Sequence, residues 1–206
     1  MSATRAVPGD AVDHLCRADP VLAAIIERVG PFAISYRDPT FETLARAIVF
    51  QQLNGKAAQT IWQRLLDAAG GEPLTPDALR RLRMPTLRRV GLSRQKATYV
   101  RELARHTADG RLDFAALPAM SDDEVIAALT QVKGIGVWSA HMFLIFALRR
   151  HDVLAVGDYG VRAAIKKLYR KRKLPSPRDM EKLARSWRPY ASAACWYLWR
   201  SQDVKL

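Results

Sequence analysis

Two glycines one residue apart are the first residues in this chain whose spacing could do chemistry. Gly134 and Gly136 lie in the segment VKGIGV, between two segments with a helical pattern of apolar residues. Glycine permits a tight turn and lets the backbone approach a neighbour closely. The free amides at the start of the following helix, at the positive end of its dipole, could then bind a phosphate. A ligand-free turn between two packed helices would give the same pattern.

Asp158 is the second candidate, 22 residues after Gly136. It follows Gly157 and opens a segment of helical period, so its carboxylate is placed to cap that helix by accepting hydrogen bonds from backbone amides. A carboxylate can also stabilise a developing positive charge or take a proton from water. The residues alone leave capping and catalysis open, and the two roles are compatible.

Residues that commonly bind metals are few and scattered. They are two cysteines and four histidines: Cys16, Cys195, His14, His106, His141 and His151. No four-cysteine zinc or iron–sulfur site and no disulfide framework can be built from them. We therefore expect no zinc, and we assign His141, inside an apolar helix, to structure.

The charge balance favours a polyanionic partner. Lys and Arg number 33 against 20 acidic residues, which gives a formal charge of +13. Such an excess attracts nucleic acid or an anionic membrane surface, although solubility alone would also account for it. No run of 18 apolar residues could span a bilayer, and the N-terminus lacks the apolar core of a secretory signal. We expect a cytoplasmic protein without a membrane partner.

The elements that must position these residues are helices throughout. Apolar residues recur with a helical period in nearly every segment and nowhere alternate as in a strand, so the expected fold class is all-α. One helix is expected from Phe41 to a turn near Asn54, and Ser93, Ser121 and Ser176 are placed to cap later helices. The segment VWSAHMFLIFAL is apolar nearly all round, so we expect it at the centre of a core.

The hairpin and the aspartate together carry a resemblance to a known family. The run LTQVKGIGVWSAHMFLIFALRRHDVLAVGDYGVRAAI resembles the helix-hairpin-helix plus Gly/Pro-Asp (HhH-GPD) motif of the base-excision DNA glycosylase superfamily. Within it, the run is similar to the AlkA-like branch, the DNA-3-methyladenine glycosylase II enzymes. Weaker likeness extends from LARAIVFQQLNGKAAQTIW to WRPYASAACWYLW, over most of the chain after residue 20.

The resemblance implies a two-lobed helical fold with a cleft between the lobes. The chain would be a single domain, 1–206, whose first lobe takes roughly residues 36–150. The second lobe would take roughly residues 1–35 together with 151–206. Nothing in the sequence calls for more than a monomer.

The resemblance also implies an activity. This is hydrolysis of the N-glycosidic bond of alkylated purines, such as 3-methyladenine and 7-methylguanine, in double-stranded DNA. The protein would then be associated with the nucleoid. The damaged nucleotide would flip out of the duplex, and Asp158 would stabilise the oxocarbenium-like transition state. Strand-cleaving relatives carry a lysine two residues after the second hairpin glycine; Trp138 stands there, so no lyase activity is expected. The alternatives are a glycosylase for uracil or hypoxanthine, and a noncatalytic DNA-binding module.

Further site residues come from the same resemblance. It places four residues around the flipped base: Trp138, Trp199, Tyr159 and Met142. It places six in contact with DNA: Gln52 and Leu53 to fill the gap in the duplex, and Lys133, Gly134, Ile135 and Gly136 at the hairpin. No cofactor is expected to be required, although the backbone carbonyls of Thr130, Val132 and Ile135 would be the ligands of a sodium or potassium ion.

The remaining aromatic and basic residues are given simpler roles. Trp62, Trp187 and Trp196 are expected in the core. The basic run from Lys166 to Lys173 is either a solvated face or a source of nonspecific attraction to DNA. Two departures from the family pattern bear on the lesion range: Met142 is aromatic in some relatives, and Ala191 replaces a common arginine.

Overall fold

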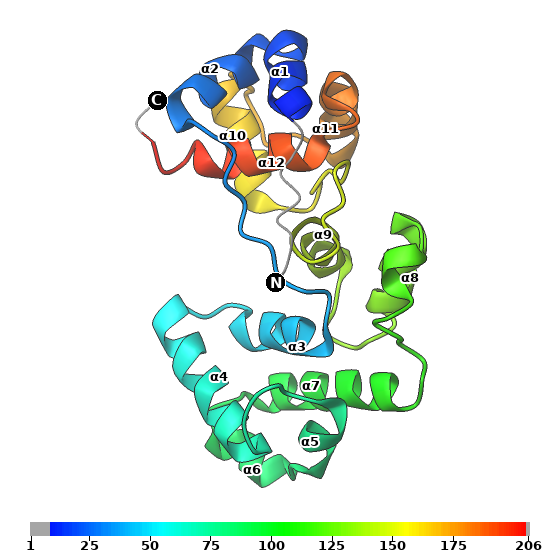
Figure 1. Ribbon diagram of the computed structural model, residues 1–206. Helices are drawn as coiled ribbons and strands as arrows, with labels where there is room; N and C mark the ends of the chain where they lie inside the picture. Colours follow the sequence, from blue (N-terminus) through cyan, green and yellow to red (C-terminus); the bar gives the residue numbers. More distant parts are fainter. Residues whose placement is uncertain (1–8, 205–206) are drawn as a thin grey trace. The chain divides into compact units, whose positions relative to one another are not determined.

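The computed structural model describes residues 9–204. Within this range the chain forms twelve α-helices, two short 3₁₀ helices and no strand, which confirms the all-α expectation (Figure 1). The chain divides into two compact units: a middle unit of residues 37–143 and a terminal unit of residues 9–36 and 144–204. Residues 1–8, part of the predicted second lobe, lie outside the described residues.

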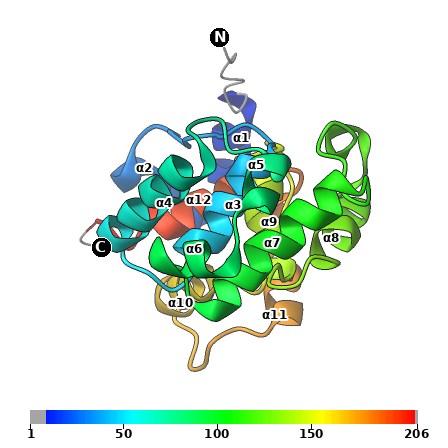
Figure 2. The same ribbon diagram turned by 90° about the horizontal axis from the view of Figure 1, so that it is seen from below.

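The middle unit is built around α7. Its elements are α3 (Phe41–Phe50), α4 (Gly55–Ala69), α5 (Pro76–Arg81), α6 (Met84–Arg89), α7 (Arg94–Ala108), η1 (Leu117–Ala119), α8 (Asp122–Thr130) and the start of α9 (Val137–Phe146). Helix α7 packs against α3 and α5, as both views show (Figures 1 and 2). Leu65, Leu79, Leu103 and Trp62 are buried there, so each helix turns its apolar stripe inward.

Helix α3 ends four residues earlier than the sequence pattern predicts. It stops at Phe50, and Gln52 takes a positive φ of 54°. Asn54 caps the next helix instead, because its side chain accepts a hydrogen bond of 2.9 Å from the amide of Ala57. A short loop of residues 51–54 therefore separates α3 from α4.

The three predicted serine caps are confirmed. The Ser93 hydroxyl accepts a hydrogen bond from an amide in the first turn of α7. Ser121 and Ser176 form capping boxes with Glu124 and Asp179, in which each side chain bonds the other residue's backbone amide. Each cap satisfies amides that the first turn of a helix leaves without a partner.

The terminal unit is built around α12. Its elements are α1 (Gly9–Ala18), α2 (Pro20–Val29), the end of α9, α10 (Tyr159–Leu168), α11 (Pro177–Leu183), η2 (Ala184–Trp187) and α12 (Ala191–Arg200). Helix α12, red in Figure 1, contacts α2 and α10, and its residues 191–198 are all buried. Helix α9, which the sequence pattern places in a core, is buried in its second half at Phe143, Leu144 and Ile145. Only its first turn is open, with Val137 51% exposed and Trp138 46% exposed.

A buried acidic residue links three elements of the terminal unit. Asp19 caps α2 through Oδ1, and its Oδ2 accepts hydrogen bonds from the Tyr169 hydroxyl at 2.7 Å and the Trp187 indole at 2.8 Å. Trp187 is fully buried, and Trp62 and Trp196 are buried as well, which confirms all three as core residues. Among residues 9–204, no helix has both the length and the apolar character needed to cross a membrane.

Candidate active site

Asp158 stands at the N-terminus of α10 and caps it. Its backbone is extended, and its Oδ1 accepts a hydrogen bond of 2.8 Å from the amide of Val161. The capping role predicted from the sequence is therefore present. The residue is only 9% exposed, so its carboxylate is held largely out of bulk water.

A second donor fixes the same oxygen from another helix. The indole nitrogen Nε1 of Trp199, near the end of α12, donates to Asp158 Oδ1 at 2.9 Å. The Trp199 ring in turn stacks on Phe146, with centroids 5.6 Å apart and planes inclined by 28°. Two directional donors on one oxygen leave the carboxyl group little rotational freedom. This is the arrangement expected of a positioned catalytic group.

Gly160 lies against Asp158 and Trp199, where a side chain would crowd them. A Cβ at this position would lie 3.1 Å from Asp158 Oδ1, 3.2 Å from the Gln202 side-chain nitrogen and 3.3 Å from Trp199 Cδ1. Sequence reasoning missed Phe146, Gly160 and Gln202. One signal was available, since glycine in the first turn of a helix is unfavourable without a packing reason.

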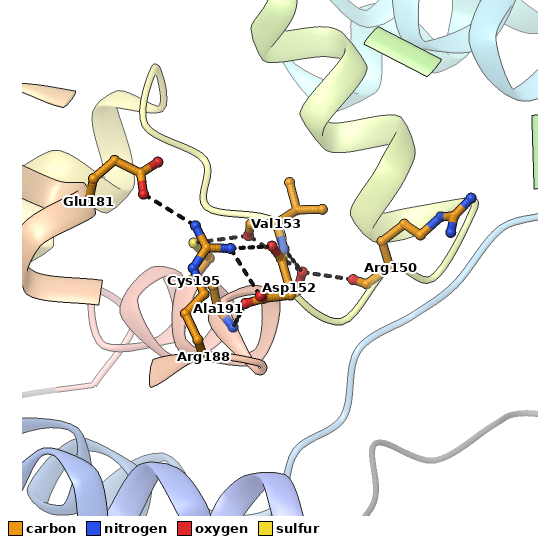
Figure 3. A network of polar contacts seen from close by, with 8 residues as sticks. Arg150, Asp152, Val153, Glu181, Arg188, Ala191 and Cys195 are labelled. Carbon is orange, nitrogen blue, oxygen red and sulfur yellow. Dashed lines mark hydrogen bonds and ion pairs between the residues drawn. The ribbon is translucent and has the colours of Figure 1, made fainter. Parts of the chain in front are cut away.

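The loop that leads to Asp158 is tied to the start of α12 (Figure 3). The Ser192 hydroxyl donates to the Arg150 carbonyl at 2.7 Å and accepts from the Val153 amide at 3.0 Å. The Ser192 amide donates to the His151 carbonyl at 3.0 Å. One serine thus forms hydrogen bonds with three backbone groups of the loop.

An arginine completes this attachment. The Arg188 guanidinium donates to the Asp152 carbonyl at 2.7 Å and pairs with Asp152 Oδ2 at 3.1 Å and Glu181 at 3.2 Å (Figure 3). Asp152 Oδ1 accepts from the Ala191 amide at the start of α12. Burial of Arg188 lowers its pKa, but its bonds to these two carboxylates outweigh that effect and leave the pKa raised. The loop before Asp158 is therefore held both through its backbone and through the side chain of Asp152.

Cys195 lies under the same loop and takes no part in chemistry. Its thiol is fully buried and weakly hydrogen-bonded to the Val153 carbonyl at 3.9 Å. Burial is the main cause that raises its pKa to about 12. Only the thiolate is nucleophilic, so Cys195 is inert at neutral pH.

The two hairpin glycines, both in the middle unit, differ in whether the fold requires glycine at their position. Gly134 has a positive φ of 94°, and a Cβ there would lie 2.1 Å from the ring of Tyr99 on α7. Gly136 needs no positive φ, and a Cβ there would meet nothing within 4 Å. The turn itself thus requires only Gly134. Gly136 leaves open space at the start of α9, where an outside group can approach the backbone.

The loop 51–54 is attached to this hairpin. The Gln51 side chain donates to the Gly134 carbonyl at 3.1 Å. The Lys96 ammonium donates to the Val49 carbonyl at 2.7 Å and to the Gln51 carbonyl, at the end of α3. Burial lowers the pKa of Lys96. Sequence reasoning missed Lys96, Tyr99 and the role of Gln51.

The remaining predicted DNA contacts are exposed in the middle unit. Leu53 is 40% exposed, and Gln52 and Lys133 are exposed too. Ile135 is instead buried at 4% exposure, so only its backbone is available to a ligand. Trp138 is half-exposed and Met142, one turn later on α9, is partly buried.

The predicted residues therefore fall into two groups. The middle unit brings together the hairpin and the loop 51–54, and it also carries Trp138 and Met142. The terminal unit brings together Asp158 and Trp199, with Tyr159 next in the chain and 71% exposed. Within the described residues, no three His, Cys, Asp or Glu side chains cluster as metal ligands.

Comparison with known proteins decides the family. The model of the HhH-GPD superfamily of base excision DNA repair proteins matches residues 45–189 of this chain. The chain belongs to this superfamily. The matched segment includes the loop 51–54, the hairpin and Asp158, while Trp199 lies beyond it.

Individual relatives of this HhH-GPD protein agree over nearly its whole length. It is 32% identical to DNA-3-methyladenine glycosylase 1 of Schizosaccharomyces pombe, over 93% of this chain and 86% of that protein. The crystal structure of DNA-3-methyladenine glycosidase from Bacillus halodurans matches with a TM-score of 0.85 and 36% identity, covering 95% and 90% of the two chains.

A third HhH-GPD relative was solved with DNA. The Schizosaccharomyces pombe 3-methyladenine DNA glycosylase in complex with abasic DNA matches with a TM-score of 0.82 and 32% identity. The match covers 95% of this chain and 97% of that chain.

Proposed function

We propose that this chain is a monofunctional DNA glycosylase that hydrolyses the N-glycosidic bond of alkylated purines in double-stranded DNA. The observation that carries the proposal is the doubly anchored Asp158 in a chain of the HhH-GPD superfamily. The relatives named above are described as acting on 3-methyladenine in DNA, which supports the substrate class. A protein that only tethers something to DNA would not need such a carboxylate.

One carboxylate is sufficient for this reaction. A purine alkylated at N3 or N7 is already cationic, so it takes the electron pair of the C1′–N bond and leaves as a neutral base. The positive charge then develops on the sugar, where Asp158 would stabilise it electrostatically. Water adds its oxygen to C1′, and Asp158 can orient it and accept its proton.

The base would leave the duplex before this step. Flipping costs a few kcal/mol and is easiest for damaged pairs. Aromatic rings repay part of this cost by stacking, and a cationic purine gains further attraction to their electron-rich faces. We propose Trp138, Tyr159 and Trp199 for this stacking, with Met142 as further lining of the base pocket and Gln52 and Leu53 filling the gap in the duplex.

The Trp199 contacts refine its part in the proposal. Its indole N–H is used on Asp158 and its ring is stacked on Phe146. Trp199 therefore acts first as a positioning residue for the carboxylate. Trp138 and Tyr159 are the more exposed rings and the better stacking partners for a base.

The hairpin would bind the DNA backbone without reading sequence. The amides at the start of α9 suit a phosphate, and Lys133 adds a charge. Backbone carbonyl oxygens can replace the hydration shell of a monovalent cation such as potassium. The Val132 carbonyl accepts one hydrogen bond, from the Ile135 amide at 3.0 Å, and a carbonyl has a second lone pair. We propose the backbone carbonyls of Thr130, Val132 and Ile135 as the ligands of such an ion, which would add positive charge near a phosphate.

The Asp158→Asn variant tests the proposal. Asparagine is an equally good N-cap and its oxygen can accept from Val161 and Trp199, so the fold is kept and only the charge is removed. With methylated duplex DNA, wild type should release free 3-methyladenine and 7-methylguanine and leave an intact abasic strand. The variant should be slower by at least about a hundredfold, with nearly unchanged affinity for duplex DNA.

Three outcomes would contradict it. Near-wild-type excision by Asp158→Asn would reject the role of the carboxylate. Release of uracil or hypoxanthine, without alkylpurines, would reject the substrate class. If the wild-type protein cleaved the DNA strand with no other reagent present, it would have lyase activity. Trp138 at the position of the lysine implies that it has none.

A further inference from the structure

A basic groove follows α10 from Tyr159, next to Asp158, to the turn after the helix. It is about 630 Å³ in volume and is lined by Tyr159, Ala163, Lys166, Lys167, Arg170, Lys171, Arg172 and Leu174. We call this set the α10 groove. Five of its eight lining residues are cationic and none is acidic, and the side chains of Tyr159 and Leu174 are exposed.

The second wall of the groove is a fixed loop. After α10 the chain reverses at Arg170, whose φ of 49° is rare for a residue other than glycine. The Lys171 amide donates to the Lys166 carbonyl at 2.9 Å, which closes the turn. At the far end, Arg162 Nε donates to the Pro175 carbonyl at 3.0 Å. The loop that forms this wall is therefore held by a hydrogen bond near each of its ends.

The cations of the groove lack ion-pair partners in the part of the chain that the structure describes. Within residues 9–204, none of the five forms an ion pair with a carboxylate. Lys171 does act on Asp179, but the pKa of that carboxyl is lowered mainly by hydrogen bonds from Ser176 and less by the charge of Lys171. Five like charges around one groove repel each other, and a bound polyanion would relieve that repulsion.

The helix itself explains only part of this charge. Lys166 and Lys167 lie in the last turn of α10, where cations interact favourably with the helix dipole. Arg170, Lys171 and Arg172 lie beyond the helix, so this interaction does not account for them. Their position on the fixed loop calls for another explanation.

We infer that the α10 groove binds the phosphate backbone of one DNA strand, next to the nucleotide that reaches Asp158. This inference rests on the proposed function, which identifies the polyanion as DNA. Lys166 and Lys167 end α10, and Arg170, Lys171 and Arg172 follow in the turn, so the cations are concentrated at one end of the groove. A strand that passes this end would meet several cations in succession, which suits the closely spaced charges of a phosphate backbone.

The experiment compares two triple variants with equal charge change. The groove variant carries Lys166→Gln, Arg170→Gln and Arg172→Gln. The control variant carries Arg80→Gln, Arg81→Gln and Arg83→Gln, three exposed cations in and after α5 of the middle unit. Circular dichroism and thermal melting establish that both are folded. Affinity for undamaged duplex DNA is then measured over a series of salt concentrations.

The groove variant should show a slope of log affinity against log salt that is shallower by about 2 to 3, near 0.9 for each phosphate that its side chains no longer neutralise. The control should change the slope by less than about 1. An equal change in both variants would mean that only net charge matters and would overturn the inference. An unchanged slope in the groove variant would overturn it as well.

A single-turnover excision assay at saturating enzyme separates this inference from the proposed function. The groove variant should excise alkylpurines at nearly the wild-type rate, since the groove contributes to binding and not to chemistry. If the wild type fails to excise but the slope still falls only in the groove variant, the proposed function fails and the groove stands. If excision is normal and the slope is unchanged, the groove inference alone fails.

Discussion

At the scale of single residues, the candidate site centres on one carboxylate oxygen that accepts hydrogen bonds from two different helices. Asp158 Oδ1 accepts from Val161 within its own helix and from Trp199 on α12. The first contact is a local cap that any helix N-terminus can form. The second exists only because two distant segments pack together, and its effect is to orient the carboxylate.

Trp199→Phe should separate the donor from the ring. The variant keeps an aromatic side chain against Phe146 but lacks the indole N–H. A hydrogen bond to a charged group is worth about 1.5–3 kcal/mol, so we expect single-turnover excision to slow by roughly tenfold or more, with duplex affinity unchanged. Gln202→Ala is the matched control: this side chain bonds the Gly160 carbonyl at 3.4 Å, not the carboxylate. Equal effects of both changes would contradict the assignment.

At the scale of elements, the hairpin contains one glycine for the fold and one for a ligand. Gly134→Ala places a methyl group against the Tyr99 ring at a positive φ, so we expect a decrease of about 1–3 kcal/mol in the free energy of unfolding. Gly136→Ala meets no neighbour and should change stability by less than about 1 kcal/mol, yet weaken duplex binding several-fold. Urea unfolding and DNA titration measure the two effects. Wild-type DNA affinity in Gly136→Ala would show that no phosphate approaches there.

At the scale of the whole molecule, two tyrosines of the terminal unit make the free energy of unfolding sensitive to high pH. Burial is the main cause that raises the pKa of Tyr169, followed by its bond to Asp19, and burial also raises the pKa of Tyr197 to about 12. A raised pKa in the folded state means that the unfolded chain loses its proton first as pH rises. Stability from these groups is therefore complete below about pH 9 and declines above pH 10.

Urea midpoints at a series of pH values between about 8 and 11 check this expectation. The wild type should lose stability over the upper part of that range. Tyr169→Phe should be less stable at the low end, because Asp19 loses a donor, but should lose less on going to the high end. Parallel declines in the two proteins would contradict the role of Tyr169.

Local rules were enough to predict most of the fold from the chain alone. The helical period, the caps at Ser93, Ser121 and Ser176, and the glycine pair of the hairpin all depend on residues a few positions apart. Asp158 as the cap of α10 is of the same kind. The predicted end of α3 was wrong because the backbone already leaves the helical conformation at Gln51, with ψ 130°, which an apolar pattern does not encode.

The tertiary structure alone decided which side chains support the site. Trp199 reaches Asp158 across 41 residues, Tyr99 packs on Gly134, and Lys96 holds the end of α3. None of these contacts follows from spacing along the chain, because a side chain's partner across helices depends on how their surfaces pack. The amino-acid order determined the helices, their caps and the acidic group at the head of α10, while packing determined how that group is oriented.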